Sequence, residues 1–164
     1  MRFPYPLYRK LPAIFMLAAL AVPAHFAAAA EMRIVGATEV VTMAEAGLPF
    51  LGRVDTGAST TSIHAVDIQV AGASPGMDCV GQQVAFTVIN ERGETCRLTA
   101  RLEKVKSVRT SEGMEALYVY LTVGWQETEK RMLVNLNDRT AMQHRLLLGR
   151  NWLENDFLVD VARR

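Results

Sequence analysis

The sequence is poor in the residues and runs on which several common functions depend. Its 164 residues include only two cysteines and three histidines, and no H-E-x-x-H sequence is present, so nothing indicates the helix of a zinc peptidase. No Gly-rich phosphate loop ending in lysine is present either, which leaves ATP binding without a basis. We therefore expect neither a metal nor another cofactor. Beyond residue 30 there is no apolar run long enough to cross a bilayer, no internal repeat and no low-complexity tract.

The first thirty residues have the pattern of a secretory signal peptide. Three basic residues lie within the first ten, residues 11–22 form an apolar run too short to span a bilayer comfortably, and an alanine run ending at Ala30 offers a cleavage site. We predict a signal peptide over residues 1–30 and a periplasmic or secreted mature protein. An uncleaved N-terminal anchor is the alternative. No cysteine lies near the cleavage point, which argues against a lipoprotein.

The predicted mature chain is of a size that suits one domain. Cleavage after Ala30 leaves 134 residues, enough for a single domain over residues 31–164 with one hydrophobic core. The leader contains three of the 18 basic residues and none of the 17 acidic ones, so the mature chain has 15 basic and 17 acidic residues and a net charge of −2. No basic patch emerges, so nucleic acid is not an expected partner.

Apolar residues of the mature chain recur mostly with a period of two, which is the period of a β-strand. The alternation is regular over residues 117–123, and residues 131–136 form the expected return strand. Turn-forming residues separate further predicted strands, at residues 84–89, 95–102, 104–110, 114–119, 146–148 and 157–161. One helical turn is expected at residues 150–154, and residues 60–67 fit either a strand or a turn. Many short strands with close turns argue for a small all-β barrel or sandwich.

The few cysteines and histidines do not form a metal site by their spacing. In an oxidising compartment a disulfide between Cys79 and Cys96 is possible, with two separate thiols as the alternative. A simple hairpin would bring Cys79 nearer Lys104 than Cys96, which does not align the pair. His64 and His144 lack ligand spacing, and each is expected to be a surface or hydrogen-bonded residue.

The stretch Asp55-Thr56-Gly57-Ala58 is the strongest functional signal and occurs once. It follows a short apolar strand, and a carboxylate placed on a tight turn after a strand is how aspartic peptidases present their catalytic acid. Glycine allows the backbone to approach the carboxylate closely. The ordinary alternative is a turn aspartate, because Asp, Thr and Gly all favour turns. The chemistry needs two carboxylates that share one proton, so an enzyme with one copy per chain has to be a homodimer.

A second stretch, Leu148-Gly149-Arg150-Asn151, lies about ninety residues later. Together the two motifs resemble the retropepsins, the one-domain aspartic peptidases of retroviruses, in which the second segment packs under the catalytic loop. Residues 105–113 and 137–142 look more closely like a bacterial retropepsin-like family, whose members are often labelled ATP-dependent zinc protease and are sometimes associated with ATP-grasp peptide ligases. The resemblance covers most of residues 51–161.

The resemblance implies a fold, an activity and a set of site residues. The fold is an all-β, acid-protease closed barrel with a flap hairpin at residues 103–119 and a short C-terminal helical turn. The activity is hydrolysis of an extended peptide or protein in a homodimer, with Asp55 as the catalytic residue of each subunit. The residues implied to support the active-site loop are Thr56, Gly57, Ala58, Gly149, Arg150 and Asn151. The residues implied to contact substrate or to form the flap are Ser59, Arg109, Ser111, Glu112 and Gly113.

Three features depart from the viral pattern. Viral enzymes usually have a second aspartate two residues after the catalytic glycine, where this chain has Ser59, so the partner of Arg150 is open. The expected flap tip carries Glu112 instead of a run of glycines. Extra sequence at residues 71–102 precedes the flap. These departures motivate an alternative function, a non-catalytic peptide-binding module on the same fold. A secreted β-domain with a chance D-T-G is a third reading.

Overall fold

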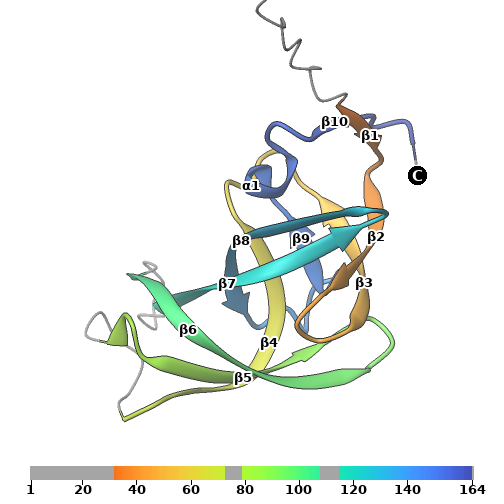
Figure 1. Cartoon of the computed structure of the whole chain (residues 1–164). Helices are drawn as coiled ribbons and strands as arrows, with labels where there is room; N and C mark the ends of the chain where they lie inside the picture. The colour runs from red at the N-terminus through yellow and green to blue at the C-terminus, as the bar shows by residue number, and fades with distance from the viewer. Residues whose placement is uncertain (1–31, 73–78, 108–114, 164) are drawn as a thin grey trace, which may run out of the picture.

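The computed structural model describes residues 32–72, 79–107 and 115–163. Its elements follow in this order: β1 (Arg33–Val35), β2 (Thr38–Met43), β3 (Leu48–Val54), β4 (Thr61–Val70), β5 (Gln83–Ile89), β6 (Thr95–Ser107), β7 (Glu115–Trp125), β8 (Thr128–Asn137), β9 (Leu146–Leu148), α1 (Arg150–Leu153) and β10 (Phe157–Val159). The expected all-β class with one helical turn near the C-terminus is confirmed (Figure 1). Among the described residues, no helix has the length and apolarity needed to span a bilayer.

Eight strands form one sheet that curls back on itself. Their order is β2-β3-β9-β4-β5-β6-β7-β8, and the additional pairings β2–β7 and β4–β8 close the sheet into a ring. Both closures are short, since β2 meets β7 over two residue pairs and β4 meets β8 over four, whereas β7 and β8 pair over nine. In Figure 1 the hairpin of β7 and β8 crosses β4 and β9. The ring encloses the hydrophobic core, so the expected closed barrel is confirmed.

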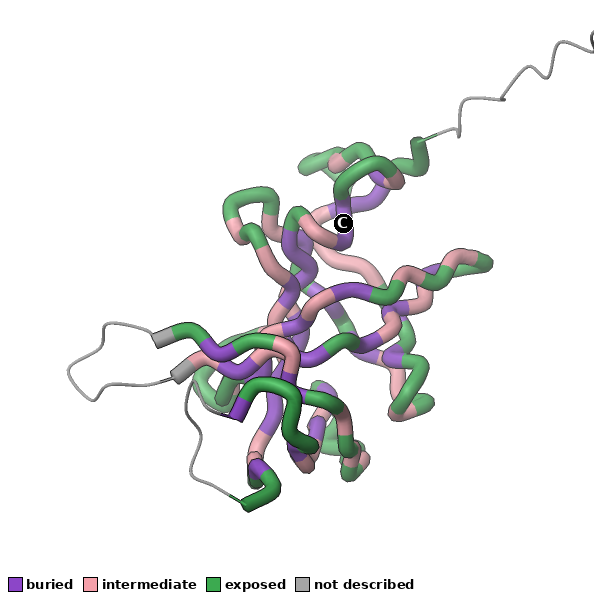
Figure 2. Tube along the Cα trace, turned by 60° about the vertical axis from the view of Figure 1, so that its left-hand side comes forward, coloured by how far each residue is buried: buried purple, intermediate pink, exposed green. Residues whose placement is uncertain are grey.

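The core follows from the alternation in the sequence. On β7, Val119, Leu121 and Val123 point inward and are at most 1% exposed, because successive side chains of a strand face opposite sides. Figure 2 shows the buried positions recurring along the strands toward the centre of the molecule. At the α1 end, Trp152 stacks on Phe157 at a centroid distance of 4.2 Å, and Trp125 meets the edge of Phe157 at 5.3 Å. The aromatic rings therefore attach the C-terminal segment to the barrel.

The pairing of β9 with both β3 and β4 places the two sequence motifs side by side. The short β9 pairs parallel with β3 and antiparallel with β4. The loop between β3 and β4, residues 55–60, therefore leaves the sheet beside the point where β9 ends at Leu148. We call these residues the Asp-Thr-Gly loop. Strand β4 also pairs parallel with β8, which leads β8 beneath the same loop.

Most predicted strands are present, and the structure resolves the ambiguous segment. The hairpins expected around residues 90–93, 111–113 and 124–126 are formed by β5–β6, β6–β7 and β7–β8. Residues 61–70 form strand β4. Strands β1 and β2 were not predicted from the sequence. The parallel pairing of β1 with β10, which joins segments more than a hundred residues apart, was not predicted either. Such a pairing leaves no local signal, because each partner alone is only three residues long.

The possible disulfide between Cys79 and Cys96 is not formed, so that expectation is corrected. In the β5–β6 ladder Cys96 pairs with Val88, whereas the N–H of Gly81, two residues after Cys79, donates to the carbonyl of Leu102 at 2.7 Å. Six residues of extended strand separate Cys96 from Leu102, about 20 Å at strand rise. A disulfide needs α-carbons within about 7 Å.

Two predictions fall on residues that lie outside the described part of the chain. The signal peptide at residues 1–30 is one of them. The tip of the expected flap, with Arg109, Ser111, Glu112 and Gly113, is the other. The described parts of β6 and β7 pair antiparallel up to Ser107 and Glu115, so the arms of that hairpin are present.

Candidate active site

The Asp55 carboxylate is held by the loop that carries it. The backbone N–H of Asp55 donates to the carbonyl of Leu148 at 3.0 Å, which fixes the residue to the end of β9. The N–H groups of Gly57 and Ala58 both donate to Asp55 Oδ1, at 2.8 and 3.2 Å. Two donors on one oxygen restrict rotation of the carboxylate. A Cβ at position 57 would lie 3.1 Å from that oxygen, so glycine suits this close approach.

The Gly-Arg-Asn segment lies directly against the Asp-Thr-Gly loop. The backbone N–H groups of Arg150 and Asn151 donate to the carbonyls of Ala58 and Ser59, at 2.8 and 3.3 Å. The guanidinium of Arg150 donates from Nη1 to the carbonyls of Thr56 and Gly57, both at 3.2 Å. Arg150 thus has partners without a second aspartate in the loop. The Ser59 hydroxyl is exposed and lies 3.5 Å from that of Thr60.

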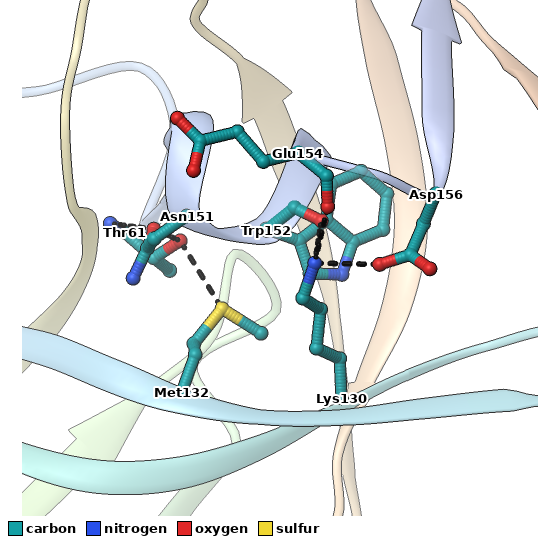
Figure 3. Close-up of polar contacts among 7 residues, drawn as sticks. All are labelled: Thr61, Lys130, Met132, Asn151, Trp152, Glu154 and Asp156. Atoms are coloured by element: carbon teal, nitrogen blue, oxygen red, sulfur yellow. Dashed lines mark hydrogen bonds and ion pairs between the residues drawn. The ribbon is translucent and has the colours of Figure 1, made fainter.

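Asn151 connects two strands, β4 and β8, beneath the loop, and Figure 3 shows it beside Thr61. Its Oδ1 accepts from the N–H of Thr61 at 2.8 Å and lies 2.9 Å from the Thr61 hydroxyl, while its Nδ2 donates to the carbonyl of Leu133 on β8 at 2.7 Å. The Thr61 hydroxyl also accepts from the N–H of Gly149 at 3.2 Å and lies 3.6 Å from Met132 Sδ. Thr61 is fully buried, so these polar groups have to find partners within the protein.

A lysine holds the other end of the helical turn. Lys130 Nζ on β8 donates to the carbonyls of Trp152 and Glu154, at 3.1 and 2.8 Å, and to Asp156 Oδ2 at 2.5 Å. Figure 3 shows the ammonium below the turn with these acceptors around it. Carbonyls at the end of a helix lack partners within the helix, and a cation there satisfies them. Together Lys130 and Asn151 attach α1 to the barrel at both ends.

Two adjoining cavities open beside Asp55. One, of about 400 Å³, is lined by Asp55, Thr56, Arg53 and residues of the C-terminal segment, including Val159 and Val161. The other, of about 490 Å³, shares Arg53 and Val161 and adds Leu51, Gln143 and His144. Arg53 is a residue of this site that the sequence patterns did not predict. Its position two residues before Asp55 is the signal, since residues i and i+2 of a strand share a face.

Residues 138–145, which connect β8 to β9 and which we call the wall segment, contribute charge near Asp55. Burial lowers the pKa of Arg139, and the Asp55 carboxylate opposes part of this shift, so the guanidinium lies within electrostatic reach of that carboxylate. The Thr140 hydroxyl and N–H, which bond to Asp138, lower the pKa of the Asp138 carboxyl. The wall segment was part of the family resemblance, but none of its residues was given a role.

His64 anchors the start of the wall segment. It is 2% exposed, and its Nδ1 accepts the backbone N–H of Arg139 at 2.9 Å. Burial and the positive charge of Arg145 lower the pKa of His64, while Asp138, at 3.5 Å from Nδ1, opposes them. The neutral ring is required for this contact, because Nδ1 can accept only without a proton. The expectation of a hydrogen-bonded histidine is confirmed. In the described part of the chain, no group of three or more His, Cys, Asp and Glu side chains could hold a metal.

The structure brings the two predicted motifs together and leaves part of the site undescribed. Asp55, Thr56, Gly57, Ala58, Gly149, Arg150 and Asn151 form one cluster linked by the contacts above. Ser59 lies at the edge of this cluster, where its backbone carbonyl accepts the N–H of Asn151. The flap residues lie outside the described chain, so their place over the site remains a prediction, as do the catalytic roles of the whole cluster.

A closed β-barrel with an Asp-Thr-Gly loop above a Gly-Arg-Asn segment defines a retropepsin-like protein. The family described as "Retropepsin-like aspartic endopeptidase RimB" matches residues 34–164. The chain belongs to this RimB-like family, and the retropepsin-like resemblance seen in the sequence is confirmed.

The similar proteins differ in length and in name. A chain of Shewanella halifaxensis (strain HAW-EB4) named "Probable alpha-L-glutamate ligase" is 32% identical over 132 residues, which are 77% of this chain and 28% of that protein. A protein of the same name from Parasynechococcus marenigrum (strain WH8102) is 33% identical over 135 residues, again 28% of its length. The chain thus spans less than a third of these relatives. The crystal structure of Lpg0085 of Legionella pneumophila, a protein of unknown function (DUF785), has a TM-score of 0.63 and 24% identity over 79% of this chain and 94% of that one, and shows the same fold.

Gly149→Ala tests the fit of the two motifs. A Cβ at this position would lie 2.6 Å from the carbonyl carbon of Thr60 and 2.9 Å from the N of Thr61, both backbone atoms that cannot move aside. We expect a loss of about 3 kcal/mol in the free energy of unfolding, measured with urea. Gly124→Ala is the matched control, because its Cβ would meet no atom closer than 3.7 Å. Equal stability of the two variants would contradict the tight packing.

His64 makes stability depend on pH in a defined direction. Its pKa is lowered in the folded protein, so below the ordinary value near 6.5 the unfolded chain binds a proton that the folded chain does not. Stability is therefore complete above that pH and falls as the pH decreases. We expect the free energy of unfolding to fall more from pH 7.5 to 5.5 in the wild type than in His64→Gln. Above pH 7.5 the two slopes should agree, and equal slopes at the lower pH would contradict the assignment.

Proposed function

We propose that this chain is an aspartic endopeptidase that acts as a homodimer, with Asp55 of each subunit in one site. The single observation that carries the proposal is the Asp55 carboxylate, fixed through Oδ1 by the N–H groups of Gly57 and Ala58 and braced from below by the Gly-Arg-Asn segment. Membership of the RimB-like family supports the same chemistry. With the predicted signal peptide, the proposed reaction would take place in the periplasm or outside the cell.

The exposed apolar side chains of β1, β10 and the tail after β10, which we call the apolar face, support a second copy of this chain as the partner. Ile34 and Leu158 pair in register across β1 and β10 and are 50% and 53% exposed. Val161, which is 83% exposed, lines the same cavity as Asp55. A second copy that covers this face would bring its own Asp55 to the cavity. A single chain provides one Asp55, and the reaction needs two carboxylates.

The mechanism follows from two carboxylates around one water. Like charges a few ångströms apart are costly, so the pair keeps one proton between its members. The ionised carboxylate takes a proton from the water as its oxygen bonds to the peptide carbonyl carbon, and the protonated carboxylate hydrogen-bonds to the carbonyl oxygen. Collapse of the tetrahedral intermediate breaks the C–N bond, and the amine leaves with a proton. The β6–β7 hairpin would bind the extended peptide through backbone hydrogen bonds.

The backbone contacts of Arg150 weigh against the alternative of a non-catalytic binding module. That alternative rested on Ser59 in place of the second aspartate and on the charge of the expected flap. Arg150 instead donates to the carbonyls of Thr56 and Gly57, so the loop is braced without the second carboxylate. The serine therefore changes an exposed group at the edge of the cluster and leaves the support of Asp55 in place.

We further propose that the peptide is rich in acidic residues, glutamate above all. Arg53 lines both cavities, and Arg139 lies within electrostatic reach of Asp55. Among the described lining residues of the two cavities, Asp55 is the one acidic side chain, so a substrate carboxylate would meet cations. Two relatives are named as glutamate ligases, and hydrolysis of glutamyl peptide bonds would reverse the outcome of such a ligation.

Asp55→Asn is the direct test of the reaction. The substitution keeps the size of the side chain but removes the proton-sharing pair, so peptide hydrolysis should fall to background. The dimer should persist in sedimentation, because the apolar face is unchanged. Hydrolysis that survives in Asp55→Asn would exclude the mechanism. A wild-type protein that stays monomeric at micromolar concentration, even with peptide present, would favour the binding module.

Arg53→Gln tests the substrate class. We expect kcat/KM for a glutamate-rich peptide to fall about tenfold or more, the size of a lost charge-assisted hydrogen bond, while a neutral peptide is cleaved as before. Arg101→Gln, at an exposed position of β6, is the control and should leave both rates unchanged. An equal loss on both peptides would contradict recognition of charge by Arg53.

A further inference from the structure

The hairpin of β5 and β6 belongs to the extra sequence that precedes the flap, and its turn is well braced. Asn90 is 2% exposed, and its Oδ1 accepts the N–H groups of Arg92 and Glu94, at 3.0 and 2.9 Å. Its Nδ2 donates to Glu94 Oε2 at 2.6 Å and to the carbonyl of Pro49 on β3 at 2.9 Å. The turn is therefore fixed internally and attached to the strand that leads to Asp55.

Glu91, the next residue of this turn, bridges two segments of the candidate site. Its Oε2 accepts the N–H of Leu51 on β3 at 3.0 Å, and its Oε1 accepts the N–H of Arg145 in the wall segment at 2.9 Å. The three residues are far apart in sequence. One carboxylate thus links the strand that carries Asp55 to the segment that faces it across the second cavity.

The wall segment depends on a chain of contacts that begins at Arg145. The guanidinium of Arg145 donates to the carbonyl of Arg139 at 2.9 Å, and Arg139 Nε donates to the carbonyl of His144 at 3.1 Å. His144 Nδ1 lies 3.3 Å from the carbonyl of Leu51. His144 also lines the cavity of about 490 Å³ together with Gln143 and Arg53. Movement of Arg145 would therefore shift the cavity wall.

We propose that Glu91 is a positioning residue for the proposed peptidase, and that the β5–β6 turn is the brace that holds the wall segment at its distance from Arg53. The inference rests on the proposed function and assigns a role to the extra sequence. Glu91 reaches no reacting atom. It acts by fixing the place of Arg145, and with it the cavity that receives a substrate side chain. Charge-assisted hydrogen bonds to backbone N–H groups are among the stronger ones, which suits a brace at the surface.

Glu91→Gln is the informative substitution, because it keeps the shape of the side chain. A glutamine has one acceptor oxygen, so one of the two N–H groups would face an amide NH₂. Glu45→Gln is the matched control. Both carboxylate oxygens of Glu45 accept the same N–H of Thr122 on β7, at 2.9 and 3.0 Å, so this variant removes an equal charge away from the wall segment while one oxygen remains to accept that N–H.

The first readout needs no activity. Amide hydrogen exchange, followed by NMR in the full mature protein, should quicken about 10- to 100-fold at Arg139 and Arg145 in Glu91→Gln, the size expected for loss of a hydrogen bond to a charged group. The same amides should exchange at the wild-type rate in Glu45→Gln. Unchanged exchange at Arg145 in Glu91→Gln, or equal changes in both variants, would overturn the inference.

The second readout separates positioning from general stability. Each protein is incubated with a randomised synthetic peptide library, products are read by mass spectrometry, and kcat and KM are measured on one cleaved peptide. Glu91→Gln should raise KM about tenfold, keep kcat within about twofold and relax the preference for one side chain beside the cleaved bond, as expected for lost binding without lost chemistry. A fall in kcat alone would overturn the inference. If the wild type cleaves nothing, the proposed function fails, and hydrogen exchange still decides whether Glu91 holds the segment.

Discussion

The contact of Asn151 with Thr61 is the interaction on which the rest of the site depends. It lies where β4, β8 and the turn after β9 meet, and its Thr61 side is fully buried. Because Asn151 provides an acceptor for β4 and a donor for β8, one side chain bonds to both strands at the end where their parallel pairing begins. Gly149 completes the contact, since any Cβ there would overlap the backbone of Thr60. We call Asn151, Thr61 and Gly149 the platform. The Asp-Thr-Gly loop rests on this platform, and Asp55 takes its orientation from that loop.

The platform explains how a single chain presents a fixed carboxylate beside open cavities. The loop is anchored from below and its upper side adjoins open cavities and an apolar strand pair. Rigid support comes from within the subunit, whereas in the proposed mechanism the second carboxylate comes from a second copy of the chain. The proposed recognition of substrate is divided in the same way. Arg53 belongs to the strand that carries Asp55, but the wall that faces it is held by His64 and by the distant turn at Glu91.

Local patterns predicted much of this fold because the alternation of apolar and polar residues indicates a strand. The hairpins around β5 to β8 were predicted, since each combines a period of two with a turn signal between its strands. The pairing of β1 with β10 was missed, because three-residue strands at opposite ends of the chain carry no such signal. Residues 60–67 were ambiguous for a related reason: most of them belong to β4, which pairs with β5, β8 and β9, and its burial reflects those partners more than its own period.

By itself, the sequence determined the all-β class, the Asp-Thr-Gly loop, the Gly-Arg-Asn segment and the retropepsin-like family. These features are carried by neighbouring residues or by motifs short enough to be read along the chain. Tertiary structure decided which groups meet. It separated Cys79 from Cys96 by the length of a strand, gave Arg150 its backbone partners, placed Arg53 and the wall segment beside Asp55, and put Glu91 between them. The physical reason is that each of these contacts joins strands whose register is set by the closure of the barrel, and no local stretch of sequence encodes that register.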